Sequence, residues 1–447
     1  MGKYINPNNE SFRNAINFEI YIDKSGLIKQ LNKVLGKEQK FICVSRARRF
    51  GKSVTAGMLK AYYSKGCNSE DLFRGLEIEK ESTYRKHLNQ YDVIHVDMAS
   101  VWLNAQKKSE QFVKVFNKML FTELKAEYET VDLSECTTLA MALAQINNEL
   151  GIRFVIIIDE WDTVFWEEKG NEQLQDEYIS VLRGMFKSEE AKQFVALAYI
   201  TGILPIKKYG IESALNNFRE YTMIDSVNFA KYYGFTSSEV KNLCEKYDMD
   251  YETMQYWYDG YSFEGEPHIY NPNSVVNAML DKRYKSYWTN TETFSSLRDY
   301  ISLNFEGLRD DIIQMFSGER CRVMVGSFAN DLISYKSKDG VLTALIHLGY
   351  LAYDFEMKEA YIPNAEVQEA FEYAINGTDW SEIVDSIKAS EELLKRTWKS
   401  DTEAVADALG KIHDETTSIL QYNDENSLSC GVYQWRSQSE KEGQSRK

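Results

Sequence analysis

The chain has 447 residues, which is enough for two or three domains of ordinary size, and 43% of them are hydrophobic, so real cores can form. Only 5 residues are proline, which argues against long disordered linkers. The net charge of −16 weighs against a protein that coats nucleic acid with a general basic surface, although it does not exclude a local basic channel.

The cysteines and the N-terminus indicate the compartment. The 6 cysteines include no C-x-x-C pair, and no histidine lies near enough to complete a zinc pattern, so we expect free thiols in a reducing environment. No run approaches the roughly 18 apolar residues that span a membrane. The polar N-terminus, MGKYINPNNE, also has no signal-peptide core. These features predict a cytoplasmic protein with no membrane partner.

The first half of the chain alternates short apolar runs with stretches of helical periodicity. The β-prone runs are Phe41–Val44, Val93–Met98, Phe154–Ile158, Phe194–Ile200 and Tyr221–Ile224. The helical stretches are Lys52–Tyr63, Gln111–Tyr128 and Thr138–Leu150. Continuous Val/Ile runs are typical of strands buried on both faces, and strands separated by helices form parallel βαβ units. The sequence therefore predicts an α/β fold, a parallel sheet flanked by helices, over residues 1–225.

The Val/Ile runs end after residue 225, and helical periodicity takes over. Gly349–Phe355 and Glu359–Ile362 form a predicted hairpin near the end of this region. We therefore expect a mostly helical, winged-helix-like domain over residues 226–380. The segment Asn426–Lys447 is polar and poor in apolar residues, so it predicts a disordered tail.

A phosphate-binding turn is predicted between the first strand and the first long helix. The segment Arg46–Ser53 (RARRFGKS) ends in the Gly-Lys-Ser of the Walker A pattern G-x-x-x-x-G-K-[ST], with Arg46 in place of the first glycine. Gly51 lets the backbone approach phosphates closely, and the amides at the helix start donate to them. Lys52 would pair with the β and γ phosphates, and Ser53 would coordinate Mg²⁺.

The predicted nucleotide-binding residues are Arg46, Ala47, Arg48, Arg49, Phe50, Gly51, Lys52 and Ser53. The arginines of this set could compensate for the missing glycine by contacting the phosphates directly. A Gly-Lys-Ser tripeptide is common by itself, so the prediction depends on the strand before it, the helix after it and an acidic partner elsewhere.

The acidic partner is predicted at the end of another strand. The run Phe154–Ile158 leads into Asp159 and Glu160, which is the Walker B arrangement. Asp159 would hold Mg²⁺, and Glu160 would polarise the attacking water. A buried strand ending in two acids is frequent, but the two motifs together in one α/β domain predict binding of ATP with Mg²⁺.

Three further residues have open roles. Thr201 follows the next strand, and strand ends line one crevice in such a sheet, so Thr201 is a candidate γ-phosphate sensor beside the plainer role of a strand-to-turn residue. Arg183 is a candidate charge-stabilising arginine, although exposure to solvent is the better expectation. Asp162 either caps the following segment or supports the site. The predicted catalytic residues are Glu160, Lys52 and Thr201.

Several segments resemble a known family when they are taken together. They are Tyr21–Ser25 (YIDKS), Ser45–Ser53 (SRARRFGKS), Phe154–Asp162 (FVIIIDEWD), Thr201–Leu204 (TGIL), Tyr233–Thr236 (YGFT), Trp257–Phe263 (WYDGYSF), Tyr270–Ser274 (YNPNS), Leu345–Tyr353 (LIHLGYLAY) and Ile362–Glu366 (IPNAE). Up to about Ser429 the chain resembles bacterial AAA-ATPase-like proteins that carry a C-terminal PD-(D/E)xK nuclease-like domain. In that family an arginine at the position of Arg46 is usual, and Ala47 stands where proline is usual.

The resemblance implies an ATPase module that switches or powers a nuclease-like module beginning near residue 381. A PD-(D/E)xK site needs an Asp followed by Glu-x-Lys on the next strand. The family carries it after the segment matching His413–Ser429, but no such strand follows Cys430 here. The triplets Glu123–Lys125 and Glu356–Lys358 are expected to be coincidental. We therefore expect residues 381–447 to be a truncated nuclease-like segment with no nuclease activity.

Different classes of function remain open at this point. The first is a Mg²⁺-dependent ATPase or nucleotide-driven switch. The second is a nucleotide-binding scaffold for protein interaction that does not turn over ATP. The third is a nucleic-acid enzyme whose nuclease part is lost. The expected partners are ATP and either a second copy of the chain or another protein, with nucleic acid implied by the resemblance alone.

Overall fold

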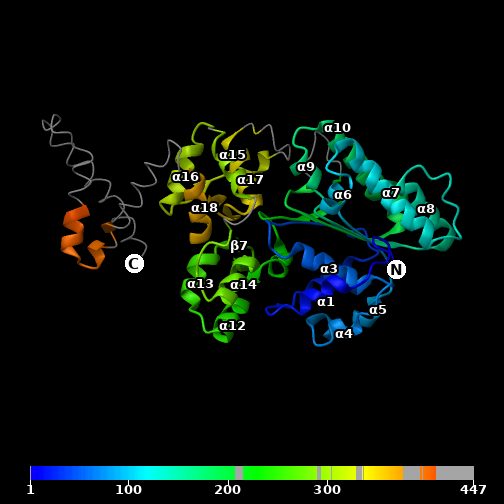
Figure 1. The fold of residues 1–447 in the computed structure, drawn as a ribbon, viewed down its shortest axis with the longest axis horizontal. Helices are drawn as coiled ribbons and strands as arrows, with labels where there is room; N and C mark the ends of the chain where they lie inside the picture. The colour runs from blue at the N-terminus through cyan, green and yellow to red at the C-terminus, as the bar shows by residue number, and fades with distance from the viewer. Residues whose placement is uncertain are drawn as a thin grey trace.

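The fold has an α/β lobe followed by a mostly helical second lobe (Figure 1). The computed structural model describes residues 2–206, 215–288, 293–303, 305–328, 335, 337–375, 393–394 and 396–408. The first lobe comprises the described residues up to 225, and the second lobe those from 226 to 375. The predicted tail Asn426–Lys447 lies outside the described residues, as does most of the predicted segment 381–447.

A five-stranded parallel sheet forms the centre of the first lobe. Its strands are β1 (Phe41–Ser45), β2 (Asp92–Asp97), β3 (Phe154–Asp159), β4 (Val195–Gly202) and β5 (Arg219–Tyr221). They lie in the order β2-β3-β4-β1-β5, and every neighbouring pair is parallel. The predicted parallel sheet is confirmed. The last strand overlaps its predicted range only at Tyr221, because the Thr222 hydroxyl accepts the Ile224 amide at 3.1 Å and closes a turn there.

Burial explains the apolar runs. Every residue of β1, β3 and β4 is buried, because these strands lie inside the sheet with both faces covered. Alternate residues of β3 pack into different hydrophobic cores. Ile156 and Ile158 lie on one face of the sheet, and Val155 and Ile157 lie on the other.

Helices cover both faces of this sheet. One face packs against α1 (Glu10–Ile16), α2 (Gly26–Val34), α3 (Lys52–Tyr63), α4 (Glu70–Phe73) and α5 (Tyr84–His87). The other packs against α6 (Met98–Asn104), α7 (Ser109–Glu127), α8 (Leu139–Leu150), α9 (Thr163–Glu167), α10 (Glu172–Phe186) and α11 (Glu189–Phe194), as Figure 1 shows for the labelled helices. The helices α3, α7 and α8 match the three predicted ones. A short 3-10 helix, η1 (Glu77–Lys80), precedes α5.

The second lobe combines helices with two small antiparallel sheets. Its helices are α12 (Ser237–Tyr247), α13 (Tyr251–Tyr258), α14 (Pro272–Asp281), α15 (Thr293–Ile301), α16 (Leu308–Phe316), α17 (Lys338–Leu348) and α18 (Ala365–Ile375), with 3-10 turns η3 (Val227–Tyr232) and η4 (Val325–Ser327). One sheet has the order β6-β8-β7, from Phe235–Thr236, Glu266–Tyr270 and Tyr261–Phe263. The other has the order β10-β11-β9, from Ala352–Asp354, Glu359–Tyr361 and Cys321–Arg322.

The structure confirms the mostly helical second half and its predicted hairpin. Strands β10 and β11 pair antiparallel within the two predicted ranges, whereas the β7–β8 hairpin was not predicted. The boundary predicted after residue 225 falls between β5 and η3.

The structure places one Glu-x-Lys triplet on a helix and the other in a hairpin turn. Glu123 is on α7, where its carboxylate accepts the amides of Lys3, Tyr4 and Ile5 at 2.7–3.0 Å and so holds the N-terminal segment. The triplet Glu356–Lys358 occupies the turn between β10 and β11. Within the described residues, no helix has the length and apolar content needed to cross a membrane.

We expect Ile156→Ala to lower the free energy of unfolding by about 2–5 kcal/mol, because it leaves a cavity in the middle of β3. The matched control is Leu103→Ala on α6, whose side chain is 62% exposed and whose loss should change stability by less than about 0.5 kcal/mol. Urea unfolding followed by tryptophan fluorescence measures both. Equal losses would contradict the placement of β3 in the core.

Candidate nucleotide site

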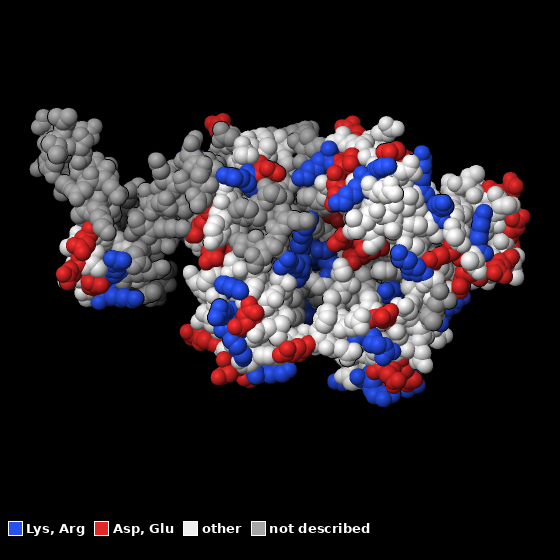
Figure 2. Space-filling model, in the orientation of Figure 1, with Lys and Arg blue, Asp and Glu red and all other residues white. Residues whose placement is uncertain are grey.

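A cavity of about 1010 Å³ lies at the carboxyl ends of the central strands, between the two lobes. In open α/β sheets this edge is where ligands bind. The volume lies at the upper end of the range of small-molecule sites. Its walls come from the β1–α3 turn, the end of β3, the segment 15–24 and the start of α14. Figure 2 shows Lys and Arg side chains gathered in a hollow where the lobes meet.

The β1–α3 turn gives this cavity a set of backbone donors. Gly51 ends the turn with φ +85°, a conformation that favours glycine, and α3 begins at the next residue. The first amides of a helix have no partner within the helix and carry the positive end of its dipole. Since Gly51, Lys52 and Ser53 all line the cavity, this end of α3 is suited to an anion.

Lys52 stabilises the turn from within. Its ammonium donates hydrogen bonds of 2.9 Å to the carbonyl oxygens of both Arg46 and Ala47. Burial lowers the pKa of Lys52, and the nearby carboxylate of Asp159 is the strongest opposing influence. The predicted pair, Lys52 and Asp159, therefore lies close enough to interact, and of the two Lys52 lines the cavity.

Three carboxylates, those of Asp97, Asp159 and Glu160, lie together at the ends of β2 and β3 and are called the acidic wall, although only Glu160 of the three lines the cavity. Asp159 is buried, which raises the pKa of its carboxyl group, while a hydrogen bond from Ser53 and the charge of Lys52 oppose this shift. Burial, followed by the charges of Asp159 and Asp97, raises the pKa of Glu160 to about 7. Glu160 also has a left-handed backbone with φ +51°, the kind of strain that collects at functional sites.

Asp97 is a site residue that sequence reasoning missed. It ends β2 directly beside Asp159 in the parallel register. Its carboxylate accepts the Ala99 amide at 3.0 Å and the Ser100 hydroxyl at 2.6 Å. The sequence could have indicated Asp97, because it is an acid near the end of the predicted strand Val93–Met98. Parallel strands bring their carboxyl ends to the same edge of a sheet.

Thr201 lies beside this acidic wall. It stands one position beyond the register pair Ile158–Ile200, next to Asp159. Its side chain is fully buried, and among the described residues its hydroxyl has no hydrogen-bond partner. A buried hydroxyl without a partner is uncommon, and Thr201 does not line the cavity itself.

The structure gives the Arg46 side chain a different role from the predicted phosphate contact. Its guanidinium is fully buried away from the cavity wall, where it donates to the Tyr221 carbonyl at 3.1 Å and the Ser226 hydroxyl at 2.5 Å. The rings of Tyr233 and Phe263 lie 5.4 and 5.1 Å from it. Burial lowers its pKa to about 10. Only the Arg46 backbone belongs to the turn.

The other predicted residues of the turn divide into two groups. Arg48 and Arg49 are exposed and line the cavity, so both remain candidates for phosphate contact. Phe50 also lines the cavity although its ring is buried, and Ala47 is buried outside the wall. Arg183 is exposed to solvent on α10, which was the favoured of the two roles predicted for it.

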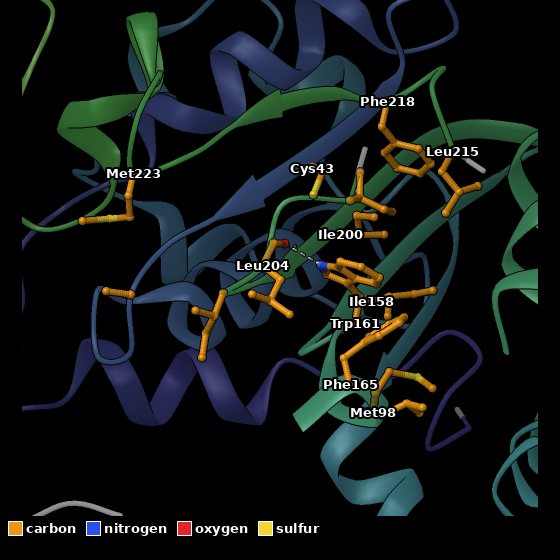
Figure 3. Close-up of a cluster of buried hydrophobic side chains, with 14 of the residues drawn as sticks. Cys43, Met98, Ile158, Trp161, Phe165, Ile200, Leu204, Leu215, Phe218 and Met223 are labelled. Carbon is orange, nitrogen blue, oxygen red and sulfur yellow. Dashed lines mark hydrogen bonds between the residues drawn. The ribbon is translucent and has the colours of Figure 1, made fainter. Parts of the chain in front are cut away.

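Asp162 supports the site rather than capping a helix. Its carboxylate accepts the amides of Ile203 and Leu204 at 2.9 and 2.8 Å, and it makes no capping bond to α9. The Trp161 indole donates to the Leu204 carbonyl at 3.2 Å from within the apolar cluster drawn in Figure 3. A Cβ on Gly202 would lie 2.4 Å from Asp162 Oδ1, so only glycine fits at this exit from β4.

The far end of the cavity is mostly apolar. Its wall includes Ile20, Ile22, Phe235, Val276 and Leu280. The segments that resemble the family contain only Ile22 and Phe235 of this set, and nothing in the sequence indicated the other three, because none of the five carries chemistry by itself.

A salt bridge joins the two lobes at this end of the cavity. The Lys24 ammonium lies 2.7 Å from the Glu239 carboxylate. Lys24 lines the cavity from the first lobe, and Glu239 belongs to α12 of the second.

The acidic wall fits Mg²⁺ only together with a ligand. Within the described residues, no cluster of three or more His, Cys, Asp or Glu side chains could hold a metal alone. Mg²⁺ usually binds one or two carboxylates together with phosphate oxygens and water. Asp159, hydrogen-bonded to Ser53, supplies oxygen donors of this type.

The parallel sheet, with its Gly-Lys-Ser turn after β1 and its acidic pair after β3, defines the fold of a P-loop NTPase. Residues 10–212 match the AAA-ATPase-like family, which is described as a predicted AAA-ATPase. The chain is also 23% identical over 285 residues to an uncharacterized protein in the vnfD 5′ region of Azotobacter chroococcum mcd 1. That match spans 63% of this chain and 52% of the relative, so the chain covers about half of the relative's length.

Two solved structures have a weak overall similarity to this chain. DnaA from Aquifex aeolicus bound to AMPPCP is 13% identical with a TM-score of 0.31, over 89% of this chain and 97% of that one. The ORC2 protein of Aeropyrum pernix is 10% identical with a TM-score of 0.35, over 86% of this chain and 98% of that one. Scores this low carry no argument, so the fold class depends on the sheet and its connections.

The raised pKa of Glu160 predicts a pH-dependent stability. Between its ordinary pKa of 4.5 and about 7, the unfolded carboxyl group is ionised while the folded one holds a proton. The unfolded state then binds fewer protons, so Glu160 destabilises the fold as pH rises through this window. Urea midpoints from pH 4.5 to 8 should fall more steeply with pH for wild type than for Glu160→Gln. Parallel curves for the two proteins, such as those expected for the exposed control Glu129→Gln, would contradict the shift.

Proposed function

We propose that this chain binds ATP with Mg²⁺ in the cavity between the lobes and acts as a Mg²⁺-dependent ATPase or nucleotide-driven switch. One observation carries the proposal. The Lys52 ammonium, anchored on two carbonyls of a glycine-ended turn, lies near enough to the buried carboxylate of Asp159, at the carboxyl end of β3, for the carboxylate to act on its pKa. A triphosphate has the charge and the length to join these two groups.

The hydrogen bonds of Lys52 support its assignment to the phosphates. An ammonium group has three donors, and two of them are used by the carbonyls of Arg46 and Ala47. The third remains for an oxygen of the β or γ phosphate. The amides at the start of α3 would bind the same phosphates, and Arg48 and Arg49 would approach them from the exposed side of the turn.

The metal and the water would be handled by the acidic wall. Ser53 and Asp159 would hold Mg²⁺, which neutralises charge that develops on the phosphates. Glu160 would orient and polarise the attacking water, and a pKa of about 7 suits a group that accepts a proton near neutral pH. The unpartnered hydroxyl of Thr201 would bind the γ phosphate or that water.

Control of a nuclease-like module is part of this proposal through the family resemblance alone. In this scheme residues 1–225 form the ATPase domain and residues 226–380 the helical, winged-helix-like domain. Residues 381–447 begin the nuclease-like part. An activating arginine from a second copy or a partner protein would then set the rate of hydrolysis.

Lys52→Ala should weaken Mg²⁺-ATP binding about 10- to 100-fold, because a charge-assisted hydrogen bond is worth about 1.5–3 kcal/mol. Isothermal titration with purified protein measures the affinity. The matched control is Lys60→Ala, which removes a lysine from the same helix outside the cavity wall. Equal effects of the two variants would show that Lys52 acts through helix stability rather than through phosphate.

Glu160→Gln should bind Mg²⁺-ATP about as tightly as wild type but release phosphate at least about 100-fold more slowly, the range expected for loss of a positioned base. A phosphate-release assay beside the binding measurement separates the two properties. If wild type binds ATP and releases no phosphate above the level of this variant, the chain is a nucleotide-binding scaffold without turnover.

A further inference from the structure

The second lobe holds the phosphate-binding turn at both of its ends through one short strand, β7. The ring of Phe50 packs edge-on against Tyr261, with centroids 5.2 Å apart and planes at 86°. At the other end of the turn, the Arg46 guanidinium lies 5.1 Å from the ring of Phe263. Tyr261 and Phe263 are two positions apart on β7 and both are buried, so the same face of the strand contacts both ends.

A second contact reaches the middle of the turn. Gly349 follows α17 with φ +85°, and a Cβ built on it would lie 2.6 Å from the Cβ of Ala47 and 3.1 Å from Trp288. The Gly349 carbonyl accepts a hydrogen bond of 2.6 Å from the Tyr261 hydroxyl. The contacts from Phe50 to Tyr261, from Tyr261 to Gly349 and from Gly349 to Ala47 therefore form a ring, which the backbone of the turn closes between Ala47 and Phe50.

These contacts fix the two carbonyl groups that hold Lys52. The ammonium is bonded to the Arg46 and Ala47 carbonyls, and these are the residues that contact Phe263 and Gly349. A small rotation of either peptide group would move its oxygen and with it the lysine. Yet Gly349 and the β7 pair stand outside the cavity wall, so they have no direct access to a nucleotide.

We propose that Gly349, Tyr261 and Phe263 are positioning residues, through which the second lobe keeps the turn in the shape that binds phosphate. This inference rests on the proposed function and assigns its regulation to a contact between lobes. Because coupling between binding and conformation is reciprocal, nucleotide binding would tighten the second lobe against the turn. A shift of the second lobe would in turn change nucleotide affinity.

The test compares two glycines, of which only Gly349 contacts the turn. Gly349→Ala and Gly318→Ala both place alanine at a positive φ, +85° and +79°, so the backbone strain is similar. A Cβ on Gly318 meets nothing within 4 Å. We expect Gly349→Ala to weaken Mg²⁺-ATP binding at least tenfold and Gly318→Ala to change it less than twofold, measured by titration at a temperature where both proteins are folded.

A rescue separates positioning from loss of stability. In the Gly349→Ala background, Ala47→Gly removes the methyl group that the new side chain meets, so it should restore most of the lost affinity. The single variant Ala47→Gly completes the double-mutant cycle. Equal affinity of Gly349→Ala and wild type would overturn the inference while leaving the proposed function intact. Failure of wild type to bind nucleotide would instead overturn the proposed function.

A milder pair of variants covers the case in which Gly349→Ala does not fold. Tyr261→Phe removes only the hydroxyl that bonds the Gly349 carbonyl. Its control, Tyr284→Phe, removes a hydroxyl that bonds the Asp250 carbonyl at 2.8 Å elsewhere in the second lobe. We expect Tyr261→Phe to weaken nucleotide binding severalfold and Tyr284→Phe to leave it unchanged. Equal affinities in this pair would also overturn the inference.

Discussion

The candidate site depends on the positions of two peptide carbonyl groups. The oxygens of Arg46 and Ala47 both point at the Lys52 ammonium, each at 2.9 Å. A buried charge is costly unless it is hydrogen-bonded and paired, and these carbonyls together with the nearby carboxylate of Asp159 meet that requirement. Lys52 therefore keeps the turn closed and its charge directed at the cavity.

The fold supplies this geometry from two directions. From the sheet, β1 lies between β4 and β5, so the turn leaves from the interior of the sheet and α3 begins at the edge where β3 ends in Asp159. From outside, the second lobe contacts the turn through β7 and Gly349. The Arg46 side chain lies within this lobe contact, which explains why a residue with a long side chain stands where the general pattern has glycine.

Local patterns in the sequence predicted the strands, turns and motifs that depend only on residues near one another in the chain. The Val/Ile runs identified β1 to β4, and the hairpin predicted within Gly349–Ile362 was confirmed. The Gly-Lys-Ser turn and Glu160 line one cavity, and Asp159 lies near Lys52. The misses have a common cause, since each depends on contacts between distant segments. The direction of the Arg46 side chain depends on β7, and Asp97 acquires its place only through the register of β2 with β3. The choice between the two roles left open for Asp162 likewise depends on the path of the chain after β4.

The central claim is tested most directly by a crystal structure of the protein with Mg²⁺ and a non-hydrolysable ATP analogue. The account predicts that the terminal phosphates contact the Lys52 ammonium and the first amides of α3, with the metal held by Ser53 and Asp159. It also predicts that Arg46 remains against Phe263. A nucleotide bound elsewhere, or bound in this cavity with its phosphates away from Lys52, would contradict the account.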